Sequence, residues 1–354
     1  MSPGAEPRTG LRDVAPYVST QLDVAARLNT NESPHPLPEG FFEELAAAVR
    51  ELPLHRYPDA QMTRLRAELG ESTGHPVEGI WAANGSNEIL TQLLQAYGGP
   101  GRAAVTFEPT YVLHERLCWL THTENRKLSL PRDFVLGEPQ VAAAVDLSPE
   151  VAFVCSPNNP TGNAQPLSSI AALAQALPES LVLVDEAYVE FAPAGSAQAL
   201  VTSYPNVVVV RTFSKAFALA GARIGYVLAV PAVVEDLQRV RLPYHLSALT
   251  QTAGIVALRH RADAATVVGA IRIQRDRITR ELRSLPDVAV YPSDANFVLF
   301  VPPGDATALW HGLLEHGVLV RDMTSVVPNA LRVTAGAEHE TDLFLKAITE
   351  VLAG

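Results

Sequence analysis

The chain has 354 residues, of which 47% are apolar and 18% charged, and its formal net charge is −11. This length and composition indicate a globular protein with two lobes, or one large lobe with a smaller one attached. The acidic charge argues against a nucleic-acid binder, which needs a basic surface. The two cysteines, Cys118 and Cys155, lie in apolar runs, which favours buried reduced thiols over a disulfide or a metal site.

The segment MSPGAEPRTGLRD at the N-terminus lacks the apolar core of a signal peptide. No apolar run in the chain is long enough to span a bilayer. Together with the reduced thiols, these features predict a cytoplasmic protein that has no membrane partner.

Residues 1–35 are polar and rich in turn signals, and they predict an N-terminal arm. Amphipathic patterns then predict helices over 41–52, 63–70 and 86–97. Beyond these, runs of Val, Leu and Ala alternate with helical patterns; the runs lie at 103–107, 151–156, 181–186, 207–212 and 225–230. Strands that are buried on both faces have this composition, so we expect an α/β fold with a mainly parallel sheet covered by helices.

The pattern changes near LPYHLS (242–247), which predicts a domain boundary near residue 240. A long helical segment is expected over about 249–285. Short strands follow in VAVYPS, NFVLFV, VLVRD and LRVTAG, and a final helix is expected over 342–353. The predicted organisation is an arm at 1–35, a large domain at 36–240 and a small C-terminal α/β domain at 241–354.

Lys215 follows a predicted strand in the segment FSKAFALAGARIG and precedes a turn rich in Ala and Gly. Small apolar neighbours remove water from an amine and lower its pKa. A neutral amine attacks a carbonyl group and forms a Schiff base. A surface lysine at a strand end is the alternative interpretation of this segment taken alone.

Asp185 ends the predicted buried strand LVLVDE. Ligands of parallel sheets gather at the carboxyl ends of the strands, and a buried carboxylate needs a cation as partner. The protonated nitrogen of a pyridine ring is such a cation, and keeping it protonated makes pyridoxal phosphate an electron sink. An aspartate that caps the next turn is the alternative.

Three further segments carry polar or aromatic groups next to predicted strands and helices. Asn159, in the rigid loop SPNNPTGN, is a candidate donor to a cofactor hydroxyl oxygen. Gly85 and Ser86 open the predicted helix 86–97, where free N–H groups and the helix dipole favour a phosphate. Tyr111, in EPTYVLH, is placed to stack on a flat ring. Each segment alone also fits an ordinary turn, a helix cap or a core aromatic residue.

The order of these motifs resembles that of fold-type I pyridoxal-phosphate aminotransferases, and within them the chain is similar to the histidinol-phosphate aminotransferase family from about residue 11 onward. SKAFALAG and NPTG mark the superfamily, whereas HRYPD, GVLVRD and the LNTNE stretch of the arm point to the narrower family. The resemblance implies a large lobe with a mainly parallel seven-stranded sheet, a smaller C-terminal α/β lobe, and a homodimer.

The resemblance also assigns roles. Lys215 would carry pyridoxal phosphate and shuttle a proton between Cα and C4′, and Asp185 would pair with the ring nitrogen. Asn159 and Tyr188 would contact the 3-hydroxyl oxygen, and Tyr111 would stack on the ring. The phosphate would be held by Ser86, Asn87, Thr212, Ser214 and Arg223. Many relatives have Gly-Ala-Asp-Glu where this chain has Gly-Ser-Asn-Glu, so Asn87 keeps a polar side chain without the charge.

The implied reaction is a transamination between glutamate and imidazole-acetol phosphate that yields L-histidinol phosphate and 2-oxoglutarate. Arginine is suited to bind both substrates, because its planar guanidinium group can donate paired hydrogen bonds to either a carboxylate or a phosphate. The anionic end of the substrate would be received by Arg321, Arg332, Tyr17 and, from the other subunit, Tyr57.

Three alternatives remain open from the sequence. An aromatic amino acid (phenylalanine) aminotransferase would keep every cofactor residue and differ only in the substrate pocket. A phosphothreonine-type decarboxylase on the same scaffold is the second. The third is a non-enzymatic effector sensor, which would need an appended DNA-binding domain.

Overall fold

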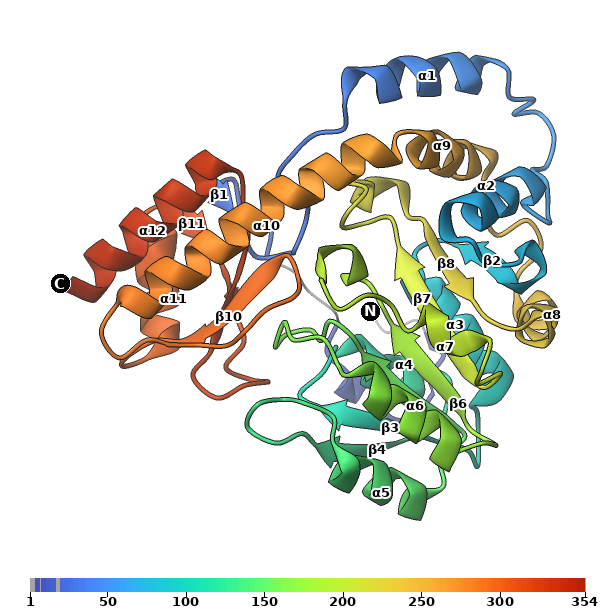
Figure 1. The fold of residues 1–354 in the computed structure, drawn as a ribbon, viewed down its shortest axis with the longest axis horizontal. Helices are drawn as coiled ribbons and strands as arrows, with labels where there is room; N and C mark the ends of the chain where they lie inside the picture. The colour runs from blue at the N-terminus through green and yellow to red at the C-terminus, as the bar shows by residue number, and fades with distance from the viewer. Residues whose placement is uncertain (1–3, 7, 17–19, 354) are drawn as a thin grey trace.

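The structure is a computed structural model that describes residues 4–6, 8–16 and 20–353. Two lobes are visible in Figure 1, and a long helix runs from one to the other. No helix within the described ranges is long and apolar enough to cross a membrane. Tyr17, a predicted substrate residue, lies outside the described residues.

The large lobe is built on a seven-stranded sheet with the order β2-β8-β7-β6-β5-β3-β4. The strands are β2 Ile80–Ala83, β3 Ala103–Glu108, β4 Glu124–Ser129, β5 Val151–Cys155, β6 Leu181–Asp185, β7 Val207–Thr212 and β8 Gly225–Leu228. β8 runs antiparallel to both of its neighbours, and all other pairs are parallel. The predicted seven-stranded, mainly parallel sheet is therefore confirmed.

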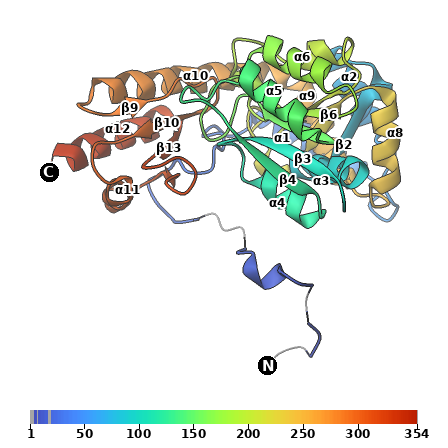
Figure 2. The ribbon, with the colours of Figure 1, turned by 90° about the horizontal axis from the view of Figure 1, so that it is seen from below.

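Helices cover both faces of this sheet, with α5 and α6 on one side and α3 and α4 on the other (Figure 2). The helices of the large lobe are α1 Glu39–Arg50, α2 Thr63–Thr73, α3 Ser86–Tyr97, α4 Leu113–Leu120, α5 Glu138–Leu147, α6 Leu167–Ala176, α7 Gln198–Val201, α8 Pro231–Val240 and α9 Ala248–Arg259. Short 3₁₀ helices lie at η1 Leu11–Asp13, η2 Val77–Gly79, η3 Val189–Phe191 and η4 Ala220–Ala222.

The small lobe contains a four-stranded antiparallel sheet with the order β12-β13-β10-β9. These strands are β9 Ala289–Val290, β10 Phe297–Val301, β12 Arg321–Asp322 and β13 Leu331–Thr334. A separate parallel pair joins β1 Ala26–Arg27 of the arm to β11 Val318–Leu319. The helices are α10 Arg261–Ser284, α11 Ala306–Glu315 and α12 Glu338–Ala353.

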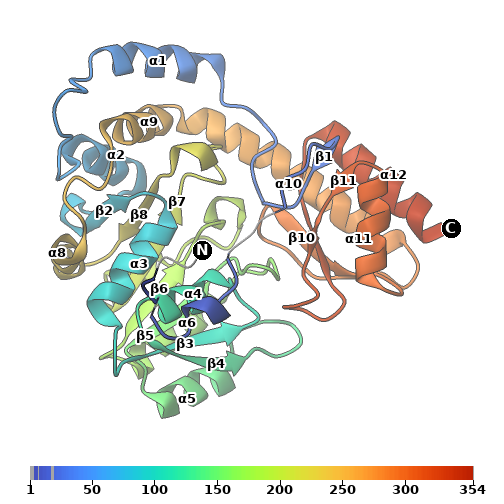
Figure 3. The same cartoon turned by 180° about the vertical axis from the view of Figure 1, so that it is seen from behind.

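The helical segment expected over 249–285 is two helices, α9 and α10, which meet at His260. Val256 and Leu258 of α9 belong to the hydrophobic core of the large lobe, whereas Val268 and later residues of α10 belong to the core of the small lobe. α10 leads from one core to the other (Figure 3). We therefore propose that the lobes divide within the first turns of α10, some twenty residues beyond the boundary expected near 240.

The arm is also divided between the lobes. Ala26 and Leu28 are buried in the core of the small lobe, although they precede the large lobe in sequence. Residues 29–32 then cross to the carboxyl ends of β6 and β7. This crossing brings backbone and side chains of the arm to the edge of the sheet where ligands of parallel sheets bind.

Candidate active site

A cavity of about 800 Å³ lies where the carboxyl ends of β5, β6 and β7 meet the arm and strands β12 and β13 of the small lobe. Most of the residues predicted from the sequence line it: Ser86, Asn87, Tyr111, Asn159, Asp185, Tyr188, Thr212, Ser214, Lys215, Arg223, Arg321 and Arg332. The structure thus brings together side chains that are up to 246 positions apart in the chain (Ser86 to Arg332). Their individual roles stay predictions.

Lys215 projects into this cavity, where its Nζ donates a hydrogen bond to the carbonyl oxygen of Thr30 at 3.0 Å. Burial is the largest cause that lowers the pKa of Lys215, from its ordinary value of 10.5 to about 8. The nearby guanidinium groups of Arg332 and Arg223 lower this pKa further, and Glu32 opposes them. Roughly a tenth of the amine is therefore neutral at pH 7, far more than for a lysine with an ordinary pKa, and a nucleophilic lysine reacts through this neutral form.

Asp185 lies on the floor of the cavity, at the last position of β6. Its Oδ2 is 3.2 Å from Nε2 of His114, and both side chains are buried. The His114 ring stacks on Phe153 with ring centroids 4.6 Å apart, and Tyr111 meets it edge-on at 5.5 Å. Sequence reasoning missed His114, because a histidine in the first turn of a helix carries no motif of its own.

A cluster of hydroxyl and guanidinium groups lines one part of the cavity. The Thr212 hydroxyl donates to Ser214 Oγ at 3.0 Å, and Arg223 Nη1 donates to the same oxygen at 3.2 Å. Ser86 and Asn87 form the first turn of α3 and line the cavity beside them. The N–H groups of a first helical turn have no partner within the helix, so this end of the cavity favours an anion.

Gly85 precedes that turn with φ +81°, and a Cβ at this position would lie 2.6 Å from Nη2 of Arg223. It does not line the cavity itself but lets Arg223 approach the helix. Tyr57 does not line the cavity either. Its side chain is 79% exposed and its ring stacks on Tyr244 at 4.4 Å.

Arg332 and Arg321 occupy directly opposed positions on the antiparallel strands β13 and β12. Paired residues of antiparallel strands point to the same face, so both guanidinium groups approach the cavity from one side. The buried Arg332 donates to the side-chain oxygen of Asn159 at 2.5 Å and to the carbonyl of Asn29 at 2.9 Å. The short sequence separation of the two arginines is thus a consequence of a single strand pairing.

The arm supplies further contacts that the sequence analysis did not assign. Nδ2 of Asn31 donates to the hydroxyl oxygen of Tyr188 at 3.0 Å, and the Asn31 N–H donates to Oγ1 of Thr334 at 3.0 Å. Burial raises the pKa of Tyr188 to about 12, so this phenol stays protonated. The segment 29–32 is therefore a wall of the cavity held by both lobes.

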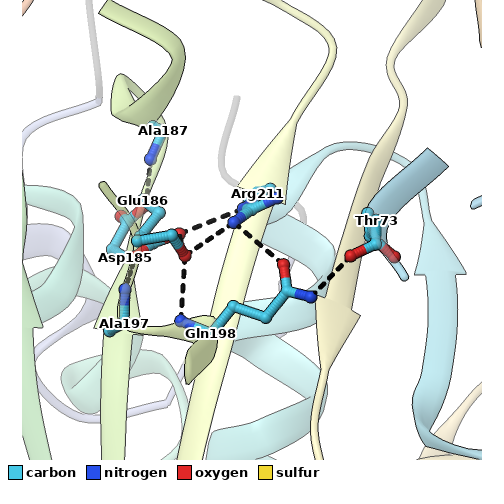
Figure 4. A network of polar contacts seen from close by, with 8 residues as sticks. Thr73, Asp185, Glu186, Ala187, Ala197, Gln198 and Arg211 are labelled. Carbon is cyan, nitrogen blue, oxygen red and sulfur yellow. Dashed lines mark hydrogen bonds and ion pairs between the residues drawn. The ribbon is translucent and has the colours of Figure 1, made fainter. Parts of the chain in front are cut away.

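An ion pair ties β6 to β7 directly beside the site. Arg211, next to Thr212, donates to the buried Glu186, next to Asp185, at 3.0 Å. Burial is the largest cause that raises the pKa of Glu186, and Arg211 opposes it. Arg211 also reaches Gln198, whose amide donates to the Thr73 carbonyl at 2.8 Å (Figure 4). The network fixes the strand ends that carry Asp185 and Thr212.

The donor set of the cavity matches the groups of pyridoxal phosphate. The helix N–H groups, Ser214 and Arg223 suit a dianionic phosphate. The buried carboxylate of Asp185 suits a protonated ring nitrogen. The partly neutral amine of Lys215, which lines the same cavity, suits the aldehyde. A cofactor that carries a phosphate, a pyridine nitrogen and an aldehyde therefore fits the residues that are present.

Comparisons with known proteins agree with this arrangement. The aminotransferase class I and II family matches residues 25–351. Histidinol-phosphate aminotransferases of Mycolicibacterium smegmatis and Frankia casuarinae are 48% and 47% identical to the chain; each alignment covers 98% of it and 93% and 90% of the relatives. A solved histidinol-phosphate aminotransferase of Sinorhizobium meliloti, in complex with pyridoxal 5′-phosphate, superimposes with a TM-score of 0.89 at 27% identity over 99% of both chains. The chain therefore belongs to the class I and II aminotransferase family.

Proposed function

We propose that the chain is a pyridoxal-phosphate-dependent histidinol-phosphate aminotransferase, which exchanges an amino group between L-histidinol phosphate and 2-oxoglutarate and so acts in histidine biosynthesis. The observation that carries the proposal is the cavity in which Lys215, Asp185 and the arginine pair meet. Near-full-length identity of 46–48% to curated relatives of that name supports the choice of substrate.

The bound cofactor supplies a protonated pyridine ring that withdraws electrons from the reacting carbon of the substrate. Residues of the chain bind and orient the cofactor and move the proton. Asp185 holds the proton on the ring nitrogen, and His114 orients Asp185. Lys215, as a neutral amine, would take the proton from Cα of the substrate and pass it to C4′ within the same half-reaction, and in the other half-reaction it would move a proton in the reverse direction. Ser86, Thr212, Ser214 and Arg223 would hold the phosphate of the cofactor and thereby fix its ring.

Both substrates of this reaction are anions, and the cavity offers two guanidinium groups on one face of the small-lobe sheet. Arg332, held by Asn159 and Asn29, is placed to receive a carboxylate or a phosphate. The guanidinium of Arg321 has no hydrogen-bond partner among the described residues, and we assign it to the second charge of a phosphate. The presence of two guanidinium groups supports a pocket that accepts a carboxylate and a phosphate in turn.

The proposed assembly is a homodimer in which Tyr57 reaches the cavity of the partner subunit. Large apolar side chains are exposed on two neighbouring segments: Leu54 60%, Tyr57 79%, Leu242 73% and Tyr244 44%. The stacked pair of Tyr57 and Tyr244 joins the segments. A patch of this kind is typical of a protein interface. A cytoplasmic location stays part of the proposal.

The test is a comparison of substrates on the purified protein reconstituted with pyridoxal phosphate. We expect kcat/KM for histidinol phosphate to exceed that for phenylalanine, with 2-oxoglutarate as acceptor, and we expect Lys215→Ala to lose activity by orders of magnitude. Lys127→Ala, which removes an exposed lysine that pairs with Glu115, is the matched control. A clear preference for phenylalanine would replace the proposal by the aromatic aminotransferase.

A further inference from the structure

The charges that line the cavity are distributed unevenly. Lys215, Arg223, Arg321, Arg332 and Arg116 are cationic, and they account for the anionic groups of cofactor and substrate. Histidinol phosphate also carries an imidazole ring, which donates hydrogen bonds through its ring N–H. An arginine has no acceptor to offer such a ring, so an acceptor has to come from elsewhere in the cavity wall.

Three carboxylates line the same cavity: Asp185, Asp322 and Glu32. Asp185 lies on the buried floor and faces His114. Asp322 accepts the N–H of Thr324 at 2.8 Å, which turns one of its oxygens toward its own loop. Glu32 is the remaining carboxylate and stands on the arm segment that crosses the site.

Contacts of the arm fix the position of Glu32. The preceding residues bind groups of the site, since Thr30 accepts from Lys215 Nζ at 3.0 Å and Asn31 donates to Tyr188 at 3.0 Å. Oε2 of Glu32 accepts from the Thr30 hydroxyl at 2.9 Å and from Arg27 at 3.3 Å. Oε1 accepts no hydrogen bond from the described residues. Glu32 is also close enough to Lys215 to act on its charge.

We propose that Glu32 is the specificity residue that recognises the imidazole ring of the substrate, with Oε1 accepting a hydrogen bond from the ring N–H. The inference rests on the proposed function. Thr30 and Arg27 hold the other oxygen, so the carboxylate is oriented before the substrate arrives and little freedom is lost on binding. A phenyl ring in the same place leaves this acceptor unpaired, and the carboxylate therefore discriminates against it.

The experiment compares histidinol phosphate with phenylalaninol phosphate, in which a phenyl ring replaces the imidazole and the phosphate and amine are kept. The half-reaction of the holoenzyme with each amine is followed through the cofactor absorption, which separates the limiting rate from the half-saturation concentration. For Glu32→Ala we expect the half-saturation concentration for histidinol phosphate to rise about ten- to a hundredfold, and that for phenylalaninol phosphate to change less than about threefold.

Glu32→Gln keeps an oxygen acceptor without the charge, so its effect on histidinol phosphate should be several-fold smaller than that of Glu32→Ala. If Glu32→Ala folds poorly, Glu32→Gln takes its place in the comparison of the two amines. Asp322→Asn is the matched control, because it neutralises another carboxylate of the same wall, and it should leave the ratio between the two amines unchanged. Glutamate, which has no imidazole, should react with both Glu32 variants at least as well as with the wild type.

An equal loss on both amines for Glu32→Ala would show that Glu32 acts through Lys215 and would overturn the proposal. A change in ratio for Asp322→Asn but not for Glu32→Ala would assign the recognition to Asp322 instead. If the wild type does not convert histidinol phosphate at all, the proposed function is refuted. If the wild type is active but Glu32→Ala leaves the ratio between the two amines unchanged, only the role of Glu32 is refuted.

Discussion

The Nε2 atom of His114 lies 3.2 Å from Oδ2 of Asp185, and the two buried side chains form one unit beneath the cavity. Nδ1 of His114 has no hydrogen-bond partner among the described residues, so the ring is held by this contact and by its stacking on Phe153. Because the carboxylate of Asp185 accepts hydrogen bonds, this contact assigns a ring proton of His114 to Nε2. His114 therefore orients Asp185 toward the space in which the cofactor ring would lie.

This pairing predicts graded effects on catalysis. Asp185→Asn removes the anion that keeps the ring nitrogen protonated, so the proton-transfer step should slow much more than cofactor binding weakens. His114→Phe keeps an aromatic ring against Phe153 but removes the N–H, and we expect a loss in kcat of about tenfold, because the hydrogen bond to a charged group is lost. Stopped-flow rates and cofactor titrations measure both. If His114→Phe only lowers cofactor affinity at an unchanged rate, the histidine has a structural role.

The lowered pKa of Lys215 predicts a stability difference in the cofactor-free protein. Between pH 8 and 10.5 the unfolded chain holds a proton on Lys215 that the native chain has released, so the stability of the wild type rises with pH in this window. Lys215→Met lacks this titration. Below about pH 8 the variant should be more stable, by on the order of 3 kcal/mol at most, and its advantage should fade toward pH 10.5.

Chemical denaturation of both proteins across this pH range measures the difference. Lys127→Met is the control, because Lys127 is exposed and pairs with Glu115 at the surface. A stability gap between Lys215→Met and wild type that stays constant with pH would show that the native amine keeps its ordinary pKa.

The arginine pair predicts different substrate profiles for two variants. Arg332 is buried and bonded to Asn159 and Asn29, so Arg332→Ala should harm the reaction of every substrate. Arg321→Ala should lower kcat/KM for histidinol phosphate about ten- to a hundredfold, because the phosphate binds both guanidinium groups. It should lower kcat/KM for phenylalanine less, because phenylalanine carries no phosphate. Arg321→Lys keeps the positive charge but loses the two parallel donors of the guanidinium. Its kcat/KM for histidinol phosphate should therefore lie between those of the wild type and Arg321→Ala. Equal losses for Arg321→Ala on histidinol phosphate, glutamate and phenylalanine would refute a phosphate-selective pocket.

The proposed sharing of Tyr57 between subunits predicts complementation. Lys215→Ala lacks the amine, and Tyr57→Phe lacks the hydroxyl but keeps a ring for stacking on Tyr244. A mixed dimer of the two variants contains one intact site, so co-expression at equal amounts should restore about a quarter of the wild-type activity. Tagged subunits allow the mixed dimer to be purified and assayed. Activity no higher than the sum of the separate variants would place Tyr57 outside the partner's site.

The ion pair behind the site predicts a stability effect. Arg211→Met leaves the buried Glu186 without its cation, which should cost about 3–5 kcal/mol in the free energy of unfolding. Arg239→Met breaks an exposed pair with Asp236 and should change this free energy by less than about 1 kcal/mol. Urea denaturation compares them. Similar small losses for both variants would mean that water replaces Arg211 beside Glu186.

Much of the fold follows from local patterns. The Val-rich runs of β5, β6 and β7 are buried on both faces, and only a sheet covered by helices satisfies such runs. β4 escaped prediction because its polar residues, ENRKLS, lie at an exposed sheet edge, where no apolar pattern is required. The reversed direction of β8 likewise depends on pairing with β2 and β7 and leaves no local signal.

The sequence by itself determined the residue types of the site and the segments that carry them, since Asp185 ends a recognisable strand and Lys215 and Asn159 each follow one. Only the tertiary structure decided which distant groups meet them. His114 reaches Asp185 from a helix, Glu32 and Thr30 arrive on an arm that is anchored in the small lobe, and Arg321 faces Arg332 through strand register. Such contacts arise from the packing of whole elements, and a local pattern of hydrophobic and polar residues does not encode them.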